Sequence, residues 1–155
     1  MTDGEDVQLV SFRIGRHEFA MDILQLQRIL RYDPPAPLPD APDFLEGVIA
    51  YEGSAVPVVD LRKRLELPAE HTDETRIMVL QLGSEKVGIV VDQAREVLRV
   101  DSSTIVAPPA MVRGLAAKYI SGILPRGDRT LVILNAQRIL NATERLALQE
   151  LEATA

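Results

Sequence analysis

One pattern of strands and turns occurs twice along the chain, and this internal repeat limits the folds that the chain can adopt. The segment that contains Gly15 aligns without a gap to the segment that contains Gly83, at an offset of 68 residues. The segments that follow align at an offset of 75 residues, which places Gly47 on Gly122. Chance similarity between two amphipathic β segments is the alternative, but the register holds across several elements.

The repeat predicts a first subdomain at residues 7–66, a second at residues 75–140 and a C-terminal segment at residues 141–155. Each unit reads as a series of short strands. Val10–Ile14, for example, alternates apolar and polar residues, which is typical of a half-buried strand. Glycine-containing turns separate the strands at regular spacing. This succession predicts a mainly β fold with two small barrels.

Helices are expected to be few and short. Asp22, Asp60 and Asn135 each stand where a side-chain oxygen can cap the first turn of a helix. Residues 141–144 resemble a capping box that opens a C-terminal helix, which either covers a barrel end or frays. The proline-rich stretch 34–42 predicts an extended connection, because proline supplies no backbone donor to a helix or a central strand.

The composition excludes several classes of partner. The formal net charge is −6, which argues against nucleic acid and against an anionic membrane surface, since both attract basic faces. No apolar run reaches the length of a transmembrane helix, and the N-terminus lacks the basic region of a signal peptide. We therefore expect a cytoplasmic protein that does not insert into a membrane.

Residues that would support catalysis are scarce. The chain has no cysteine and only two histidines, His17 and His71, which lie in a predicted turn and a polar loop. The sequence contains neither a phosphate-binding loop nor a nucleophile elbow. It therefore predicts a binding module with no catalytic residues, no cofactor and no metal site. An enzyme, the alternative, would need a polar pocket with converging titratable groups.

Four stretches of the chain resemble the CheW family. Leu9–Ile23 is similar to the family's opening hairpin. Gly47–Arg62 is similar to its most recognisable stretch, G-V-x-N-L-R-G-x-x-V-P-V-x-D-L-R. Val87–Asp92 and Tyr119–Ile123 are also similar. The resemblance covers nearly the whole chain and implies two five-stranded, SH3-like barrels, in agreement with the repeat.

The resemblance also implies a function. It implies a non-catalytic adaptor that binds the cytoplasmic hairpin tip of a chemoreceptor and the regulatory domain of a CheA-type histidine kinase. Such an adaptor would be recruited to membrane-associated receptor arrays. Two alternatives remain open: a subunit of a non-motility chemosensory pathway, and a decoy that binds the kinase but not receptors.

The chain departs from the family pattern at two places. Where the family often has V-x-E-I, this chain has Leu26-Gln-Arg-Ile29, and where the family often has N-L-R, it has Ala50-Tyr-Glu52. The resemblance assigns both places to the region of receptor and array contacts. The candidate partner-binding residues are therefore Leu26, Arg28, Ile29, Tyr51 and Glu52.

These candidates carry further interpretations. If Arg28 and Glu52 form a salt bridge, they are a paired charge reversal that insulates this adaptor from a parallel system. The alternative is independent drift of two exposed charges, since an exposed ion pair contributes only about 0–1 kcal/mol. Tyr51 either anchors a partner or packs inside the domain. Asp60 and Arg62 are interpreted as helix-start residues with a structural role.

Overall fold

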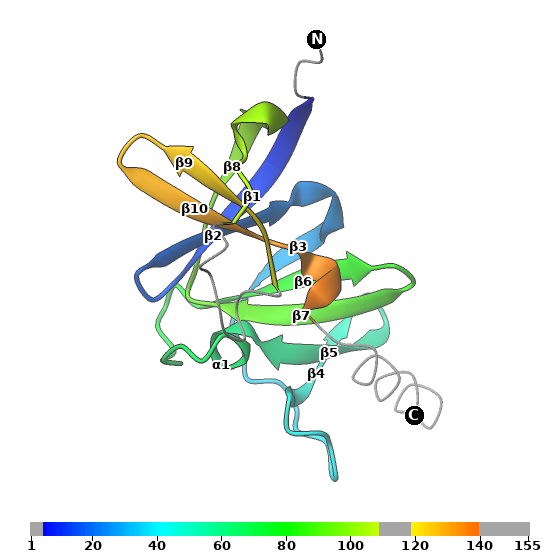
Figure 1. Cartoon of the computed structure of the whole chain (residues 1–155). Coiled ribbons are helices and arrows are strands. Elements are labelled where there is room, and N and C mark those ends of the chain that lie inside the picture. Colours follow the sequence, from blue (N-terminus) through cyan, green and yellow to red (C-terminus); the bar gives the residue numbers. More distant parts are fainter. Residues whose placement is uncertain (1–4, 109–118, 140–155) are drawn as a thin grey trace.

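The chain folds into two five-stranded β-sheets packed against each other (Figure 1). The computed structural model describes residues 5–108 and 119–139. The first sheet has the order β8–β1–β2–β10–β9, with β1 (Asp6–Ile14), β2 (His17–Asp22), β8 (Gln93–Asp101), β9 (Ile120–Arg126) and β10 (Arg129–Leu134). The second has the order β3–β6–β7–β5–β4, with β3 (Leu26–Arg31), β4 (Leu45–Tyr51), β5 (Ser54–Asp60), β6 (Arg76–Leu82) and β7 (Glu85–Val91).

The described helices are single turns, so the prediction of a mainly β fold is confirmed. They are η1 (Ile23–Gln25), α1 (Leu61–Arg64), η2 (Ser102–Thr104) and η4 (Ala136–Arg138). The predicted caps at Asp22, Asp60 and Asn135 are also confirmed, because each side chain accepts a hydrogen bond from the backbone N–H two residues later. The expected C-terminal helix at residues 141–155 lies outside the described residues.

The repeat is confirmed strand by strand, because substituting each strand by its repeat equivalent converts one sheet order into the other. The sheets, however, do not divide the chain at residues 7–66 and 75–140. Residues 26–91 supply every strand of the second sheet, whereas the first sheet takes its strands from both sides of that segment. The chain crosses between sheets at η1 and again after β7. The repeat reveals which strands are alike, but only long-range pairing decides which strands are neighbours.

Apolar side chains form three layers, one between the sheets and one on the other face of each sheet. A shared core lies between the sheets, where Phe12 and Met21 of the first sheet face Met78 and Leu80 of the second. Each sheet also has its own cluster on its other face, around Leu131 in the first sheet and in two groups in the second. Both faces of the central strands are therefore buried, which explains why β5 and β7 are nearly continuous apolar runs.

Gly47 lets a connecting segment approach the second sheet closely. The segment after β3 forms a bridge from Ala36 to Val48 of β4. A Cβ atom on Gly47 would overlap the carbonyl oxygen of Ala36, and its φ of +151° is one that side chains rarely adopt. Its repeat equivalent, Gly122, lies beside the matching bridge from Val106 to Ile123. Glycine is therefore a packing requirement at both positions.

We predict that Gly47→Ala lowers the free energy of unfolding by about 3 kcal/mol, because it adds overpacking to backbone strain. The matched control is Gly83→Ala, where φ is +65° but nothing lies within 4 Å of the added Cβ. That control should cost only about 1 kcal/mol, the conformational penalty. Urea unfolding measures both, and equal losses would contradict the close-approach argument.

Arg129 joins three strands at the surface of the first sheet. Its guanidinium donates to both carboxylate oxygens of Glu18 on β2, at 3.0 and 2.5 Å. It also reaches Glu96 on β8 at 3.3 Å. The hydrogen bonds from Arg129 lower the pKa of Glu18 despite an opposing effect of burial. The ionised form of Glu18 is thus favoured in the folded protein.

Glu18 should therefore contribute stability that is full above its unfolded pKa of 4.5 and is lost as the pH falls through the lower, folded-state value. We predict that Glu18→Gln makes the free energy of unfolding depend less strongly on pH in the acid range. Near neutral pH, the dependence of the free energy of unfolding on pH should change little. Unfolding midpoints measured across the acid range test the prediction. A variant whose acid limb is as steep as that of the unaltered protein would refute it.

Candidate functional site

Three of the five candidate residues lie on β3, an edge strand of the second sheet. Arg28 is exposed, and Ile29 is 38% exposed although it is aliphatic. Leu26 is partly buried and packs against the shared core between the sheets. Because β3 pairs only with β6 among the described strands, its outer edge is available to a partner.

The other two candidates lie at the end of β4, the opposite edge strand. Tyr51 is 7% exposed and packs against Val56 and Val79. Glu52 occupies the turn to β5 with a φ of +48°. Tyr51 is thus part of the core of the second sheet, which favours packing over a direct contact with a partner.

The interior of the second sheet links the two groups of candidates. Val79 pairs directly with Arg28 in the β3–β6 ladder, and it packs against Tyr51. Cross-strand partners point to the same face of a sheet, so Arg28 and Tyr51 flank one apolar side chain. Val79 thus connects Tyr51 with Arg28 through the interior of the sheet, although β3 and β4 form its opposite edges.

The structure does not form the salt bridge between Arg28 and Glu52 on which the charge-reversal hypothesis depends. Glu52 instead lies 3.9 Å from Nζ of Lys86 on β7. That ammonium also lies 5.6 Å from the centre of the Tyr51 ring, within the range of a cation–π contact. No ion pair joins Arg28 to Glu52 in the described part of the chain. Sequence reasoning missed Lys86, because only the parallel pairing of β5 with β7 brings it to this end of the sheet.

Arg62 forms the most heavily bonded buried polar site. Its side chain is 0% exposed, and it makes a two-pronged contact with Asp60 at 2.8 and 2.9 Å. It also donates to the carbonyl of Glu70 at 2.6 Å and to Asp92 at 3.1 Å. Burial acts to lower the pKa of Arg62, but the hydrogen bonds and charges of Asp60 and Asp92 outweigh it, so the pKa is raised. The guanidinium is held permanently charged.

His71 completes this network from the following loop. Its Nδ1 lies 3.2 Å from Nη2 of Arg62, and because a guanidinium can only donate, that nitrogen must accept. The His71 ring stacks on Tyr32 with centroids 4.3 Å apart. Burial raises the pKa of Tyr32, so its hydroxyl stays protonated. His71 thus has a structural partner, although it is exposed as expected for a loop residue.

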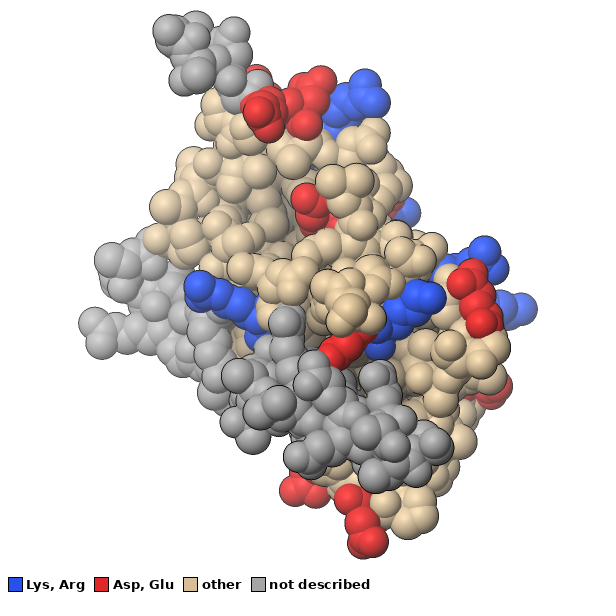
Figure 2. All heavy atoms as spheres, turned by 90° about the vertical axis from the view of Figure 1, so that its right-hand side faces the viewer, with Lys and Arg blue, Asp and Glu red and all other residues tan. Residues whose placement is uncertain are grey.

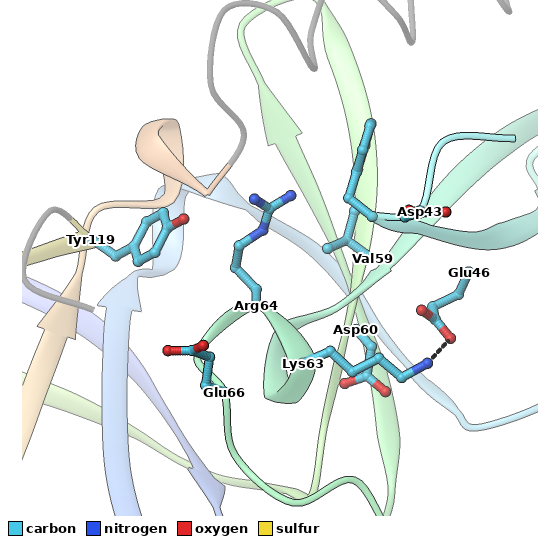
Figure 3. A pocket seen from close by; sticks show the side chains of 9 residues that line it. Asp43, Glu46, Val59, Asp60, Lys63, Arg64, Glu66 and Tyr119 are labelled. Atoms are coloured by element: carbon cyan, nitrogen blue, oxygen red, sulfur yellow. Dashed lines mark hydrogen bonds and ion pairs between the residues drawn. The ribbon is translucent and has the colours of Figure 1, made fainter. Parts of the chain in front are cut away.

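A cleft of about 350 Å³ lies beside α1 and is lined by polar and charged residues. Figure 3 shows Arg64 projecting between Tyr119 on one side and Val59 on the other. The neighbouring Lys63 is turned toward Glu46 and bonds it at 2.8 Å. This hydrogen bond raises the pKa of Lys63, which makes it a poor base or nucleophile. Within the cleft, Lys63 is therefore held in an ion pair with Glu46.

The described surface also gives no sign of a metal site or membrane span. No group of three or more potential ligands among His, Cys, Asp and Glu is present in the described residues. Within the same residues, no helix is long and apolar enough to cross a bilayer. On the face shown in Figure 2, acidic and basic side chains stand in small separate groups on a mostly uncharged surface.

Two five-stranded sheets with unpaired edge strands are the architecture of a protein-binding module. Comparison with known proteins then identifies the family: residues 8–144 match the model of the CheW-like domain, and the chain belongs to the CheW family. Members of this family are non-catalytic scaffolding proteins of chemotaxis.

Curated relatives and a solved structure agree with this assignment. The chain is 34% identical over 144 residues to the chemotaxis protein CheW of Klebsiella aerogenes, covering 91% of this chain and 87% of that one. It is 34% identical over 135 residues to CheW of Bacillus subtilis, covering 86% of each. The crystal structure of the scaffolding protein TtCheW from Thermoanaerobacter tengcongensis superposes with a TM-score of 0.82 at 25% identity, covering 90% and 97%.

We predict that Arg62→Met destabilises the protein by about 3–5 kcal/mol, because it leaves the buried carboxylate of Asp60 without its partner. The matched control is Lys63→Met, one residue along α1. Its ion pair with Glu46 is exposed, so its loss should cost at most about 1 kcal/mol. Urea unfolding compares the two, and a similar small loss for both would show that the network contributes little.

Proposed function

We propose that this protein is an adaptor that joins the cytoplasmic hairpin tip of a chemoreceptor to the regulatory domain of a CheA-type histidine kinase. The observation that carries the proposal is the family match over residues 8–144. The relatives are matched over most of their own length, so the shared role does not require a domain that this chain lacks. The adaptor would work in the cytoplasm, at membrane-associated receptor arrays.

We further propose that the partner surface includes Leu26, Arg28, Ile29, Tyr51 and Glu52. Two features support it. Ile29 is an exposed aliphatic side chain on a sheet edge that no other described strand covers, and such an edge can accept a partner. Lys86 contacts both Glu52 and the ring of Tyr51 at the surface, which links the turn after β4 to β7. Ile29 and Arg28 would touch the partner, and Tyr51 would support the surface from inside.

Two other roles would use the same fold. A subunit of a non-motility pathway would make the same contacts with a different receptor and kinase. A kinase-binding decoy would keep the kinase contact and lose the receptor contact. The altered residues Arg28 and Glu52 are the specific reason to consider the decoy, because the family often carries the opposite charges there.

The test is titration of the purified chain against the CheA regulatory domain and a receptor cytoplasmic fragment from its own cell. Binding to both supports the adaptor. Binding to the kinase domain alone favours the decoy, and binding to neither means that the fold serves another task.

We predict that Ile29→Ser weakens binding to at least one of these partners by roughly tenfold or more, since truncating an interface anchor costs over about 1 kcal/mol. The control is Val106→Ser, another exposed aliphatic side chain, which lies beside β9 of the first sheet and should leave binding unchanged. Calorimetric titration gives both values. An effect of the same size in the control would place the anchor elsewhere.

A further inference from the structure

We propose that the free edge of β3 binds an acidic protein surface and that it rejects a basic one. The inference rests on the proposed function, because it specifies the chemistry of the partner at that same surface. It goes beyond that function in stating which charge the partner must carry.

The charges of β3 are all of one sign. Its side chains include Arg28 and Arg31 and no acid, and both arginines are exposed. Neither has an ion pair within the described residues. Arg31 pairs across the ladder with Arg76, which adds a third positive charge. The guanidinium of Arg76 donates to the backbone carbonyls of Asp73 and Thr75, at 2.7 and 2.9 Å, so its charge is not cancelled by a carboxylate there.

The nearby acids form no ion pair with Arg28 or Arg31 in the described part of the chain. Glu52 is the acidic member of the candidate surface, but its carboxylate faces Lys86. Asp33, the first acidic residue after β3, is exposed and makes no ion pair in the described chain. The positive charge of Arg28 and Arg31 is therefore displayed outward.

The repeat supplies an internal comparison. In β8, the equivalent of β3, Val97 takes the place of Ile29 and is likewise exposed. The position of Arg28, however, is occupied by Glu96, which bonds Arg129 within the protein. Arg99, the equivalent of Arg31, lines a depression together with Asp6 and Asp22. The same strand in the same fold is thus mixed in charge at β8 and purely basic at β3.

The basic edge is also not a consequence of overall charge, because the chain has a net charge of −6. Guanidinium groups bind carboxylates through paired, directional hydrogen bonds, so Arg28 and Arg31 suit Asp or Glu on a partner. Side chains alternate along β3, so Ile29 shares one face with Arg31 and offers the partner an aliphatic contact, whereas Arg28 extends from the other face of the same edge. A partner with Lys or Arg opposite this edge would meet like charges, which is an effective means of rejecting it.

The experiment titrates the receptor fragment and the kinase regulatory domain with Arg28→Glu/Arg31→Glu and with Arg99→Glu. The control, Arg99→Glu, makes the same change at the repeat-equivalent position. We expect the double variant to bind at least one partner about tenfold more weakly or worse, and the control to change binding less than threefold or so. Thermal melting should show both variants folded, because the substituted side chains are exposed.

Two further arms separate attraction from a general loss of binding. Raising the salt concentration should weaken binding of the unaltered protein and have little effect on the double variant, because the screened attraction is already absent there. Replacing the facing acids of the partner by arginine should restore binding to the double variant. Undiminished binding by the double variant, or an equal loss with Arg99→Glu, would overturn the inference while leaving the adaptor function intact. No binding by the unaltered protein would overturn both.

Discussion

The buried guanidinium of Arg62 is the interaction on which the arrangement of the sheets depends. It joins the start of α1, the loop at Glu70 and the bend after β7. Asp92 extends this network, because its second carboxylate oxygen accepts a hydrogen bond from the backbone N–H of Gly15 at 2.6 Å. Gly15 belongs to the β1–β2 turn of the first sheet, so one chain of charged hydrogen bonds spans both sheets. Such a network is costly to break, since the loss of Arg62 would leave the carboxylate of Asp60 buried and charged.

The shared core and this network together explain why the two halves of the repeat exchange strands. The hairpins β1–β2 and β6–β7 bury both of their faces, one against the other sheet and one inside their own. Each hairpin therefore needs strands on both sides, and the chain supplies them by crossing between sheets at η1 and after β7. The result is a symmetric frame in which equivalent strands, β3 and β8, stand at equivalent edges.

On that symmetric frame the surface charges are not symmetric, and this difference bears on function. At β8, Glu96 takes the place of Arg28 and accepts a hydrogen bond from Arg129. At β3 both arginines remain unpaired, while Glu52 is used by Lys86. The interpretation of Arg28 and Glu52 as a mutual pair is therefore wrong in its geometry. The two charges instead differ in their partners, because Glu52 lies beside Lys86 at the surface and Arg28 has no ion pair among the described residues.

Much of this could be read from the residues, because the signals are local. Alternating apolar residues, turn glycines and capping side chains indicated the strands, the turns and the three helix caps within a residue or two. The repeat offsets indicated which elements are equivalent, and the family motifs indicated the candidate surface. The missed features involve residues far apart in the chain: the exchange of strands, the contact of Lys86 with Glu52, and the joining of Arg62 to Asp92 and His71.

The sequence by itself determined the mainly β class, the twofold repeat, the family and the residues of the candidate surface. Only the tertiary structure decided which strands are neighbours and which charges neutralise one another. The physical reason is that strand propensity and capping depend on adjacent residues. Sheet pairing and ion pairing, in contrast, depend on distances between segments that come together only when the shared core forms.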